Sequence, residues 1–168
     1  VVKSDSLLRC VACYACLAKC PRGIRLTDVL LPLVKEQVLV TRTEMPAEFQ
    51  KSLENMHRYG NPMGESPRKR AAWTASAGTK IPILAEVKRE VDVLWFVECY
   101  TSFYARGQDN SRATAKLFDA LGVDFAILGN EEKCAGDCGQ MTWESGLFES
   151  LAEYNMKLFN KYRFRRLV

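Results

Sequence analysis

Residues 91–98, "VDVLWFVE", decide the fold because they form a continuous run of β-branched and aromatic residues. Such a run is typical of a strand that is buried on both faces of a parallel sheet. A helix is expected over residues 110–122, and residues 123–129, "VDFAILG", repeat the strand pattern. A second helix over residues 142–162 and a third strand in residues 163–168 are expected next. This alternation predicts an α/β fold with a parallel, Rossmann-like sheet and right-handed crossovers.

Both expected helices carry apolar residues at helical spacing, which is typical of a face that packs on a core. The stripe of the first helix comprises Ala113, Leu117, Ala120 and Leu121, with Gly122 placed to end the helix. The stripe of the second comprises Leu147, Leu151, Tyr154, Leu158 and Phe159. Trp95, Phe96 and Phe125 are expected in the core.

Two further segments precede this α/β pattern. Residues 1–40 are expected to form a small α-helical, ferredoxin-like domain, in which an apolar helical segment begins at Leu26 and Thr27 or Asp28 could cap it.

Residues 41–90 are interpreted as a helical linker. It contains a polar helix over residues 45–60, with Pro46 suited to the first turn and Gly60 to the stop. The turn-forming residues after it would wrap a surface or join two modules. Because the last strand begins where the sequence ends, we expect residues 91–168 to be part of a longer chain.

Composition limits the classes of function that the chain can have. Its 168 residues, 48% of them hydrophobic, are enough to form a hydrophobic core. The sequence contains no apolar run of about 18 residues, the length that a membrane-spanning helix needs. Contact with a membrane would then come through a partner. Without a secretory signal in view, seven cysteines indicate reduced metal ligands in the cytoplasm and not a disulfide framework.

Charge and motifs exclude several other classes. The net charge of +4 is spread too evenly for a nucleic-acid surface, and the clusters at residues 68–70 and 163–166 are expected to be solvated. His57, the only histidine, is expected to face solvent. The sequence contains no Ser-His-Asp set, Walker loop or G-x-G-x-x-G motif, so hydrolase and nucleotide-binding functions find no support.

The strongest motif is C-x2-C-x2-C-x3-C-P, formed by Cys10, Cys13, Cys16, Cys20 and the proline that follows. This spacing is typical of a [4Fe-4S] cluster, whose sulfur ligands each bind a different iron. Zinc is the competing interpretation, but zinc sites usually pair two cysteines with a distant second pair. In two-cluster ferredoxins the fourth cysteine binds the other cluster, so Cys20 serves either this cluster or one whose motif lies upstream. We favour the upstream motif.

The other three cysteines form a second candidate site. Cys99 ends the first predicted strand, and Cys134 and Cys138 follow the second. Because parallel strands end at the same edge of a sheet, where ligands of open α/β sheets bind, we expect these thiols to meet there. Gly136 and Gly139 would let the backbone approach a bulky inorganic group. The alternative is a buried core thiol at Cys99 and two ordinary loop residues.

Residues directly after Cys99 offer a weaker signal. Tyr100, Tyr104 and Arg106 would line a substrate pocket or form a plain connection between strand and helix.

The order of these motifs resembles the heterodisulfide reductase family of iron–sulfur proteins across the whole chain. "CVACYACLAKCPRGI" is similar to the second ferredoxin motif of that family, and "YGNPMGE" to its linker. The region from residue 91 is similar to the first half of its cysteine-rich (CCG) domain. Cys99, Cys134 and Gly136 match the family pattern, but Ala135 stands where the second cysteine of the pair is expected. This departure favours a simpler or differently ligated cluster.

The resemblance implies an oxidoreductase subunit that acts on sulfur groups. Cys10, Cys13, Cys16 and Cys20 would hold a relay cluster, and Cys99, Cys134 and Cys138 a catalytic cluster. Electrons would come from a membrane cytochrome b-type, quinol-oxidising subunit and reduce a disulfide or trisulfide, for example on a small sulfur-carrier protein in sulfite respiration. The protein would then lie at the cytoplasmic face of the membrane.

Two alternatives remain open. One is a pure electron relay between a flavoprotein and quinone or another reductase, and the other is a zinc-stabilised binding module.

Overall fold

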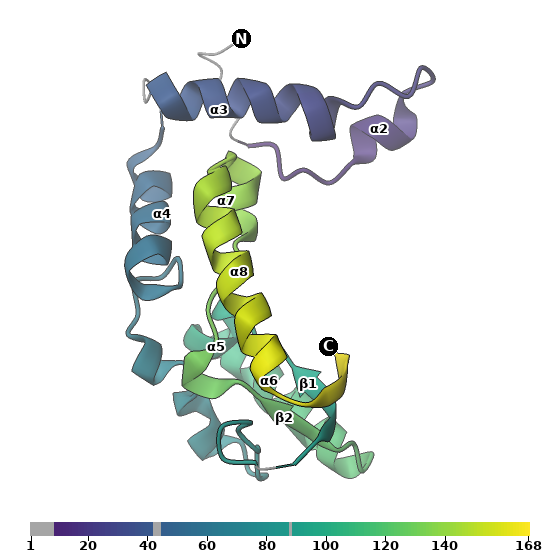
Figure 1. Cartoon of the computed structure of the whole chain (residues 1–168), viewed down its shortest axis with the longest axis vertical. Coiled ribbons are helices and arrows are strands. Elements are labelled where there is room, and N and C mark those ends of the chain that lie inside the picture. The colour runs from purple at the N-terminus through teal and green to yellow at the C-terminus, as the bar shows by residue number, and fades with distance from the viewer. Residues whose placement is uncertain (1–8, 42–44, 88) are drawn as a thin grey trace.

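The computed structural model describes residues 9–41, 45–87 and 89–168 (Figure 1). A helical head lies at one end of the molecule and a small α/β module at the other, with α4 running beside α8 between them. In chain order the elements are α2 (Ala15–Lys19), the π-helix η1 (Leu26–Leu30), α3 (Leu31–Thr41), α4 (Ala47–Tyr59), the 3-10 helices η2 (Pro67–Lys69) and η3 (Ala72–Ser76), β1 (Val91–Trp95), α5 (Cys99–Phe103), α6 (Ala105–Ala120), β2 (Phe125–Ile127), the 3-10 helix η4 (Gly129–Glu131), α7 (Asp137–Thr142), α8 (Ser145–Lys161) and β3 (Phe164–Leu167).

The sheet is parallel and has the strand order β2-β1-β3. Val93 on the central strand pairs with Phe125, and Val91 pairs with Phe164. Four of the five residues of β1 are buried, as the uninterrupted apolar run requires of a strand covered on both faces. The predicted α/β fold with a parallel sheet is therefore confirmed.

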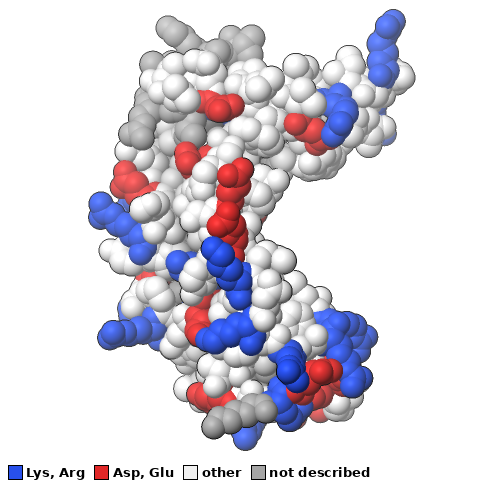
Figure 2. Space-filling model, viewed as in Figure 1, with Lys and Arg blue, Asp and Glu red and all other residues white. Residues whose placement is uncertain are grey.

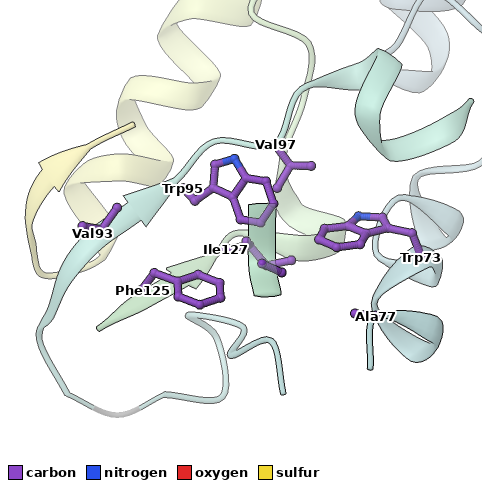
Figure 3. Close-up of a cluster of buried hydrophobic side chains, with 8 residues drawn as sticks. Trp73, Ala77, Val93, Trp95, Val97, Phe125 and Ile127 are labelled. Atoms are coloured by element: carbon purple, nitrogen blue, oxygen red, sulfur yellow. The ribbon is translucent and has the colours of Figure 1, made fainter. Parts of the chain in front are cut away.

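Two apolar clusters cover the sheet. One gathers Trp73 and Ala77 from the segment before β1 against Trp95, whose ring centre lies 5.7 Å from that of Trp73 (Figure 3). The other contains Leu84, Val91, Leu94, Ala126, Leu128 and Leu158. Trp95 and Phe125 are core residues, as expected, whereas Phe96 is half-buried. Leu147, Leu151 and Leu158 are buried as predicted for the stripe of α8, but Tyr154 of the same stripe is exposed.

The apolar stripe predicted for α6 is on the wrong face. Leu117 and Leu121 are 56% and 68% exposed, whereas the buried face carries Gly107, Ser111 and Ala115. These small side chains let α6 approach α5 closely, and the Ser111 hydroxyl donates to a backbone carbonyl at 3.0 Å. The buried face of α6 therefore carries small residues instead of large apolar ones, because α5 packs close against it.

Gly107 tests this close approach. A Cβ atom at this position would lie 2.3 Å from the carbonyl oxygen of Tyr100, so Gly107→Ala must push α5 and α6 apart. We expect the free energy of unfolding in urea to fall by about 1–3 kcal/mol. Gly146→Ala, in the first turn of α8, meets nothing nearer than 3.7 Å and should be neutral or stabilising. Equal effects of the two changes would contradict the tight α5–α6 contact.

The segments before the sheet confirm some expectations and correct others. The polar helix α4 starts directly after Pro46 and stops at Gly60, whose φ of 68° is the left-handed conformation that favours glycine. Neither Thr27 nor Asp28 caps the next helical segment, because η1 begins after Arg25 without a side-chain cap. Asp28 instead pairs with Arg25 at 2.9 Å.

Charge is for the most part distributed as expected. On the visible face, basic side chains lie at several separate places and are mixed with acidic ones (Figure 2). His57 is exposed. Within the described part of the chain, no helix is long and apolar enough to cross a membrane.

Candidate functional site

The two cysteines that the sheet was predicted to bring together do meet at its carboxyl edge. Cys99 is the first residue of α5, four residues after the end of β1, and Cys134 lies in the loop after β2 and η4. The ligand atoms of Glu98, Cys99 and Cys134 all lie within 4.8 Å of one another. Both thiols are buried, 4% and 2% exposed, beneath Met56 of α4. A separation of 35 residues in the chain thus becomes a single cluster of side chains.

Cys138 stands slightly apart. It lies half-buried on α7 and packs against the same apolar cluster, but it is not one of the three residues whose ligand atoms converge. Burial raises the pKa of its thiol, with further contributions from the charges of Asp137 and Cys99. The structure therefore places Cys138 beside the site and not within its centre.

The pKa values of the two central thiols are shifted in opposite directions. The pKa of Cys99 is lowered, first by a hydrogen bond from Cys134 and further by the charge of Arg70. The pKa of Cys134 is raised because that thiol supplies the hydrogen bond and is itself buried. Cys99 is consequently the more acidic thiol of the pair, and the thiolate is the form of cysteine that binds metal.

Arg70 is a site residue that the sequence analysis missed. It belongs to the cluster at residues 68–70 that was expected to be solvated, yet it is only 2% exposed. Its Nη1 group pairs with Glu132 at 3.0 Å, and Nη2 donates to the sulfur of Cys99 at 3.2 Å. The expectation was wrong for Arg70 because the buried carboxylate and thiol stabilise an inward-facing guanidinium. Its neighbours Arg68 and Lys69 are exposed, as expected.

Glu132 binds both Arg70 and the backbone directly before Cys99. Its carboxylate accepts the backbone N–H groups of Val97 at 3.1 Å and Glu98 at 2.9 Å, in addition to Arg70. Burial raises the pKa of Glu132 to about 7, while the charge of Arg70 and these two N–H groups oppose the rise. The carboxylate therefore depends on its three partners to remain ionised inside the protein.

Glu98, like Glu132, is a site residue that the sequence analysis missed. Its backbone has φ 72° and ψ 168°, a region that glycine alone usually occupies, and such strain is typical of functional sites. This conformation turns the half-buried carboxyl group toward the two thiols. Burial raises its pKa, and the charge of Asp137 adds to the rise. Its place directly before Cys99 was the one signal in the sequence that could have identified it.

The glycines near Cys134 pack against the start of α8. Gly136 has φ 92°, and a Cβ atom there would lie 3.1 Å from the ring of Phe148 on α8. Gly139 is close to the backbone of Glu144. Only Gly136 therefore requires glycine, because of its positive φ and its contact with α8, and its N–H donates to the Cys134 sulfur at 3.5 Å.

The four cysteines of the head lie near the surface. Cys13 and Cys16 are exposed, and Cys10 and Cys20 are half-buried. The sulfur of Cys16 lies 3.2 Å from the hydroxyl of Thr27, and the Ile24 N–H bonds to Cys20 at 3.5 Å and lowers the pKa of that thiol. Among the residues that the structure describes, no three sulfur atoms of the head lie within 4.8 Å of one another. The ligand atoms at the sheet edge do.

Lys35 joins the head to the α/β module. Its side chain is buried, and its ammonium group donates to the backbone carbonyls of Cys10 at 3.0 Å and Met141 at 2.6 Å. Cys10 is the first cysteine of the head motif, and Met141 lies on α7, directly after the loop that carries Cys134. Burial lowers the pKa of Lys35. One cation therefore connects the two cysteine groups.

The donor set fits an iron–sulfur cluster at both places. The head offers four exposed or half-buried thiols within eleven residues, and the sheet edge offers two buried thiols, of which Cys99 has a lowered pKa. In addition, Arg70 Nε is buried and has no hydrogen-bond partner among the described groups. A buried N–H group without a partner is costly, and the acceptor sulfurs of a bound cluster would satisfy it.

Residues Tyr100, Tyr104 and Arg106 are exposed beside this site. The rings of the two tyrosines lie 5.1 Å apart at the junction of α5 and α6. They form a surface feature and do not enclose the thiols.

Comparison with known proteins points in the same direction. Residues 93–168 match the family described as the cysteine-rich CCG domain. The whole chain is 31% identical to a probable membrane-anchored ferredoxin of Chromohalobacter salexigens and 29% identical to an EtfAB:quinone oxidoreductase of Syntrophomonas wolfei, covering 24% of each relative. It is also 24% identical, over 98% of its length and 38% of the relative, to one of the proteins of the dihydromethanophenazine:CoB–CoM heterodisulfide reductase from Methanosarcina barkeri. No solved structure matches.

The chain thus spans about a quarter of the length of the first two relatives. The names of the three relatives describe a ferredoxin, a quinone oxidoreductase and a subunit of a heterodisulfide reductase.

Proposed function

Residues 93–168 of this chain belong to the cysteine-rich CCG domain family, and from this premise we propose a two-site electron relay. The chain is an iron–sulfur electron-transfer subunit related to heterodisulfide reductase. In the proposal, Cys10, Cys13, Cys16 and Cys20 hold a [4Fe-4S] cluster in the head, with Cys20 free to serve a neighbouring cluster instead. Cys99, Cys134 and Cys138 hold a second cluster at the sheet edge. Each cluster supplies single-electron transfer when bound.

The protein groups around the second site are suited to electron transfer through packed protein. Cys99 and Cys134 are almost fully buried under α4, and the apolar side chains that cover them exclude water. Lys35 fixes Cys10 relative to α7, so the distance between the two sites is set by the fold and not by a flexible connection. Arg70 supplies a fixed positive charge beside Cys99.

This burial is the observation that favours a relay over direct reduction of a sulfur–sulfur bond. A disulfide substrate must touch the reacting centre, whereas electron transfer to a neighbouring group needs only close packing. The relatives at 29% and 31% identity include the one named EtfAB:quinone oxidoreductase. We therefore place the chain between a reduced flavoprotein and a quinone-reducing partner in the membrane. Two single-electron transfers with two protons convert the quinone to a quinol.

Reduction of a disulfide or trisulfide is the second candidate. The relative named as part of a heterodisulfide reductase and the lowered pKa of the Cys99 thiol support it. In this case a quinol-oxidising cytochrome b would supply two electrons, and a disulfide with two protons would give two thiols. Access to Cys99 would require α4 to move away from the sheet edge, which the relay does not need.

The acceptor distinguishes these candidates. The complete protein with its partner subunits, prepared without oxygen, is given either reduced electron-transferring flavoprotein with a soluble quinone as acceptor, or a soluble quinol with a small disulfide as acceptor. We expect quinone reduction and no release of thiols. Thiol formation at a comparable rate would instead support the second candidate. A colourless protein that contains zinc and no iron would contradict both.

A further inference from the structure

Arg70 has a role at this site that the family assignment does not supply. We infer that Arg70 is a positioning residue that raises the reduction potential of the cluster at Cys99 by holding a positive charge and an N–H donor against the Cys99 sulfur. The inference rests on the proposed cluster at the sheet edge. It assigns control of that cluster to a residue from the segment before the α/β module.

The guanidinium group is held in one orientation. Nη1 pairs with Glu132 at 3.0 Å, and Nη2 donates both to Cys99 at 3.2 Å and to the carbonyl of Gly60 at 3.3 Å. The Cζ atom of the Arg70 guanidinium lies 5.1 Å from the centre of the Phe103 ring. Contacts on several sides fix both the direction of the donor and the place of the charge, and a planar, forked guanidinium suits this arrangement better than an ammonium group.

Gly60 connects Arg70 to the second thiol. The carbonyl of Gly60 accepts the backbone N–H of Cys134 at 2.8 Å as well as Nη2 of Arg70. This carbonyl is free to do so because Gly60 ends α4 in the left-handed conformation. The end of α4 therefore positions the backbone of one proposed ligand and the cation that contacts the other.

The effect on potential follows from the charge added on reduction. Hydrogen bonds to ligand sulfurs and the local net charge are two main factors that set the potential of an iron–sulfur cluster. An electron arriving beside a buried guanidinium is stabilised, because the protein interior screens the attraction weakly. Glu132 offsets part of this charge, but its carboxylate also faces the N–H groups of Val97 and Glu98. The N–H···S bond to Cys99 acts in the same direction as the charge.

The test is a redox titration of the cluster-loaded complete protein, followed by electron paramagnetic resonance. In Arg70→Met we expect the ratio of reduced to oxidised sheet-edge cluster at a fixed applied potential to fall about tenfold, which corresponds to about 59 mV for one electron. The head cluster is the internal reference and should not change. Arg68→Met is the matched control, because Arg68 lies two residues away in η2 and is exposed.

Arg70→Gln removes the charge but keeps an N–H donor, and it should give a smaller shift in the same direction. An unchanged potential in a loaded Arg70→Met or Arg70→Gln protein overturns the inference and leaves the proposed relay intact. Failure of both variants to hold the sheet-edge cluster also overturns it, in favour of a role in assembly alone. Absence of that cluster from the wild-type protein would contradict the proposed function itself.

Discussion

Cys99→Ala is expected to remove the sheet-edge cluster and abolish electron transfer to the acceptor, while the head cluster stays loaded. Cys99 is the thiol of the buried pair whose pKa is lowered, and its removal leaves Cys134 as the one remaining thiol at the centre of the site. It also deprives Arg70 of the sulfur that accepts from Nη2. The iron content should fall by about four atoms per chain if the lost group is a [4Fe-4S] cluster.

Iron and sulfide analysis, together with low-temperature electron paramagnetic resonance, measures this loss. Cys16→Ala is the reciprocal control, because it should remove the head cluster and spare the one at the sheet edge. Each variant then retains the signal that the other has lost. Undiminished iron in Cys99→Ala would show that Cys99 is a core thiol, which was the simpler interpretation of the sequence.

Glu132→Gln is expected to destabilise the folded protein by about 3–5 kcal/mol, the usual consequence of breaking one partner of a buried ion pair. The amide keeps an oxygen that can accept from the Val97 N–H, but the Arg70 guanidinium loses its counter-charge where it is 3% exposed. Urea unfolding of the protein without clusters measures the change. The double variant Arg70→Met/Glu132→Gln should recover part of the loss, because it leaves no unpaired charge.

Glu131→Gln provides the matched comparison. Glu131 is the adjacent residue and also pairs with a cation, Lys161 at 2.6 Å, but this pair is largely exposed. Exposed pairs contribute little because water screens them, so we expect a loss below about 1 kcal/mol. Equal losses in the two variants would mean that the buried pair contributes no more than the exposed one.

Much of the fold could be predicted from the sequence because the signals were local. The apolar run at residues 91–98 contains β1, which ends at Trp95, and the helical spacing of Leu147, Leu151 and Leu158 marked the buried face of α8. The prediction of the buried face of α6 was wrong, because the pattern of large apolar residues does not reveal which face a neighbouring helix will cover. Gly107 and Ser111 were the informative residues there, since they allow α5 to approach.

The sequence by itself determined the chemistry that the protein can perform. The cysteine spacing in the head indicates iron–sulfur binding, and the places of Cys99 and Cys134 after two parallel strands predicted that they would meet. Both conclusions need only local spacing and the rule that parallel strands end at the same edge.

Only the tertiary structure decided which charges surround those thiols. Arg70 contacts Cys99 across 29 residues and Glu132 across 62, and Lys35 reaches Met141 across 106. In the sequence none of these charged residues is marked by a motif, and Lys35 even lies within an apolar segment. A charge is stable inside a protein only where partners from other segments replace its water, so its burial becomes visible only once those segments are packed together.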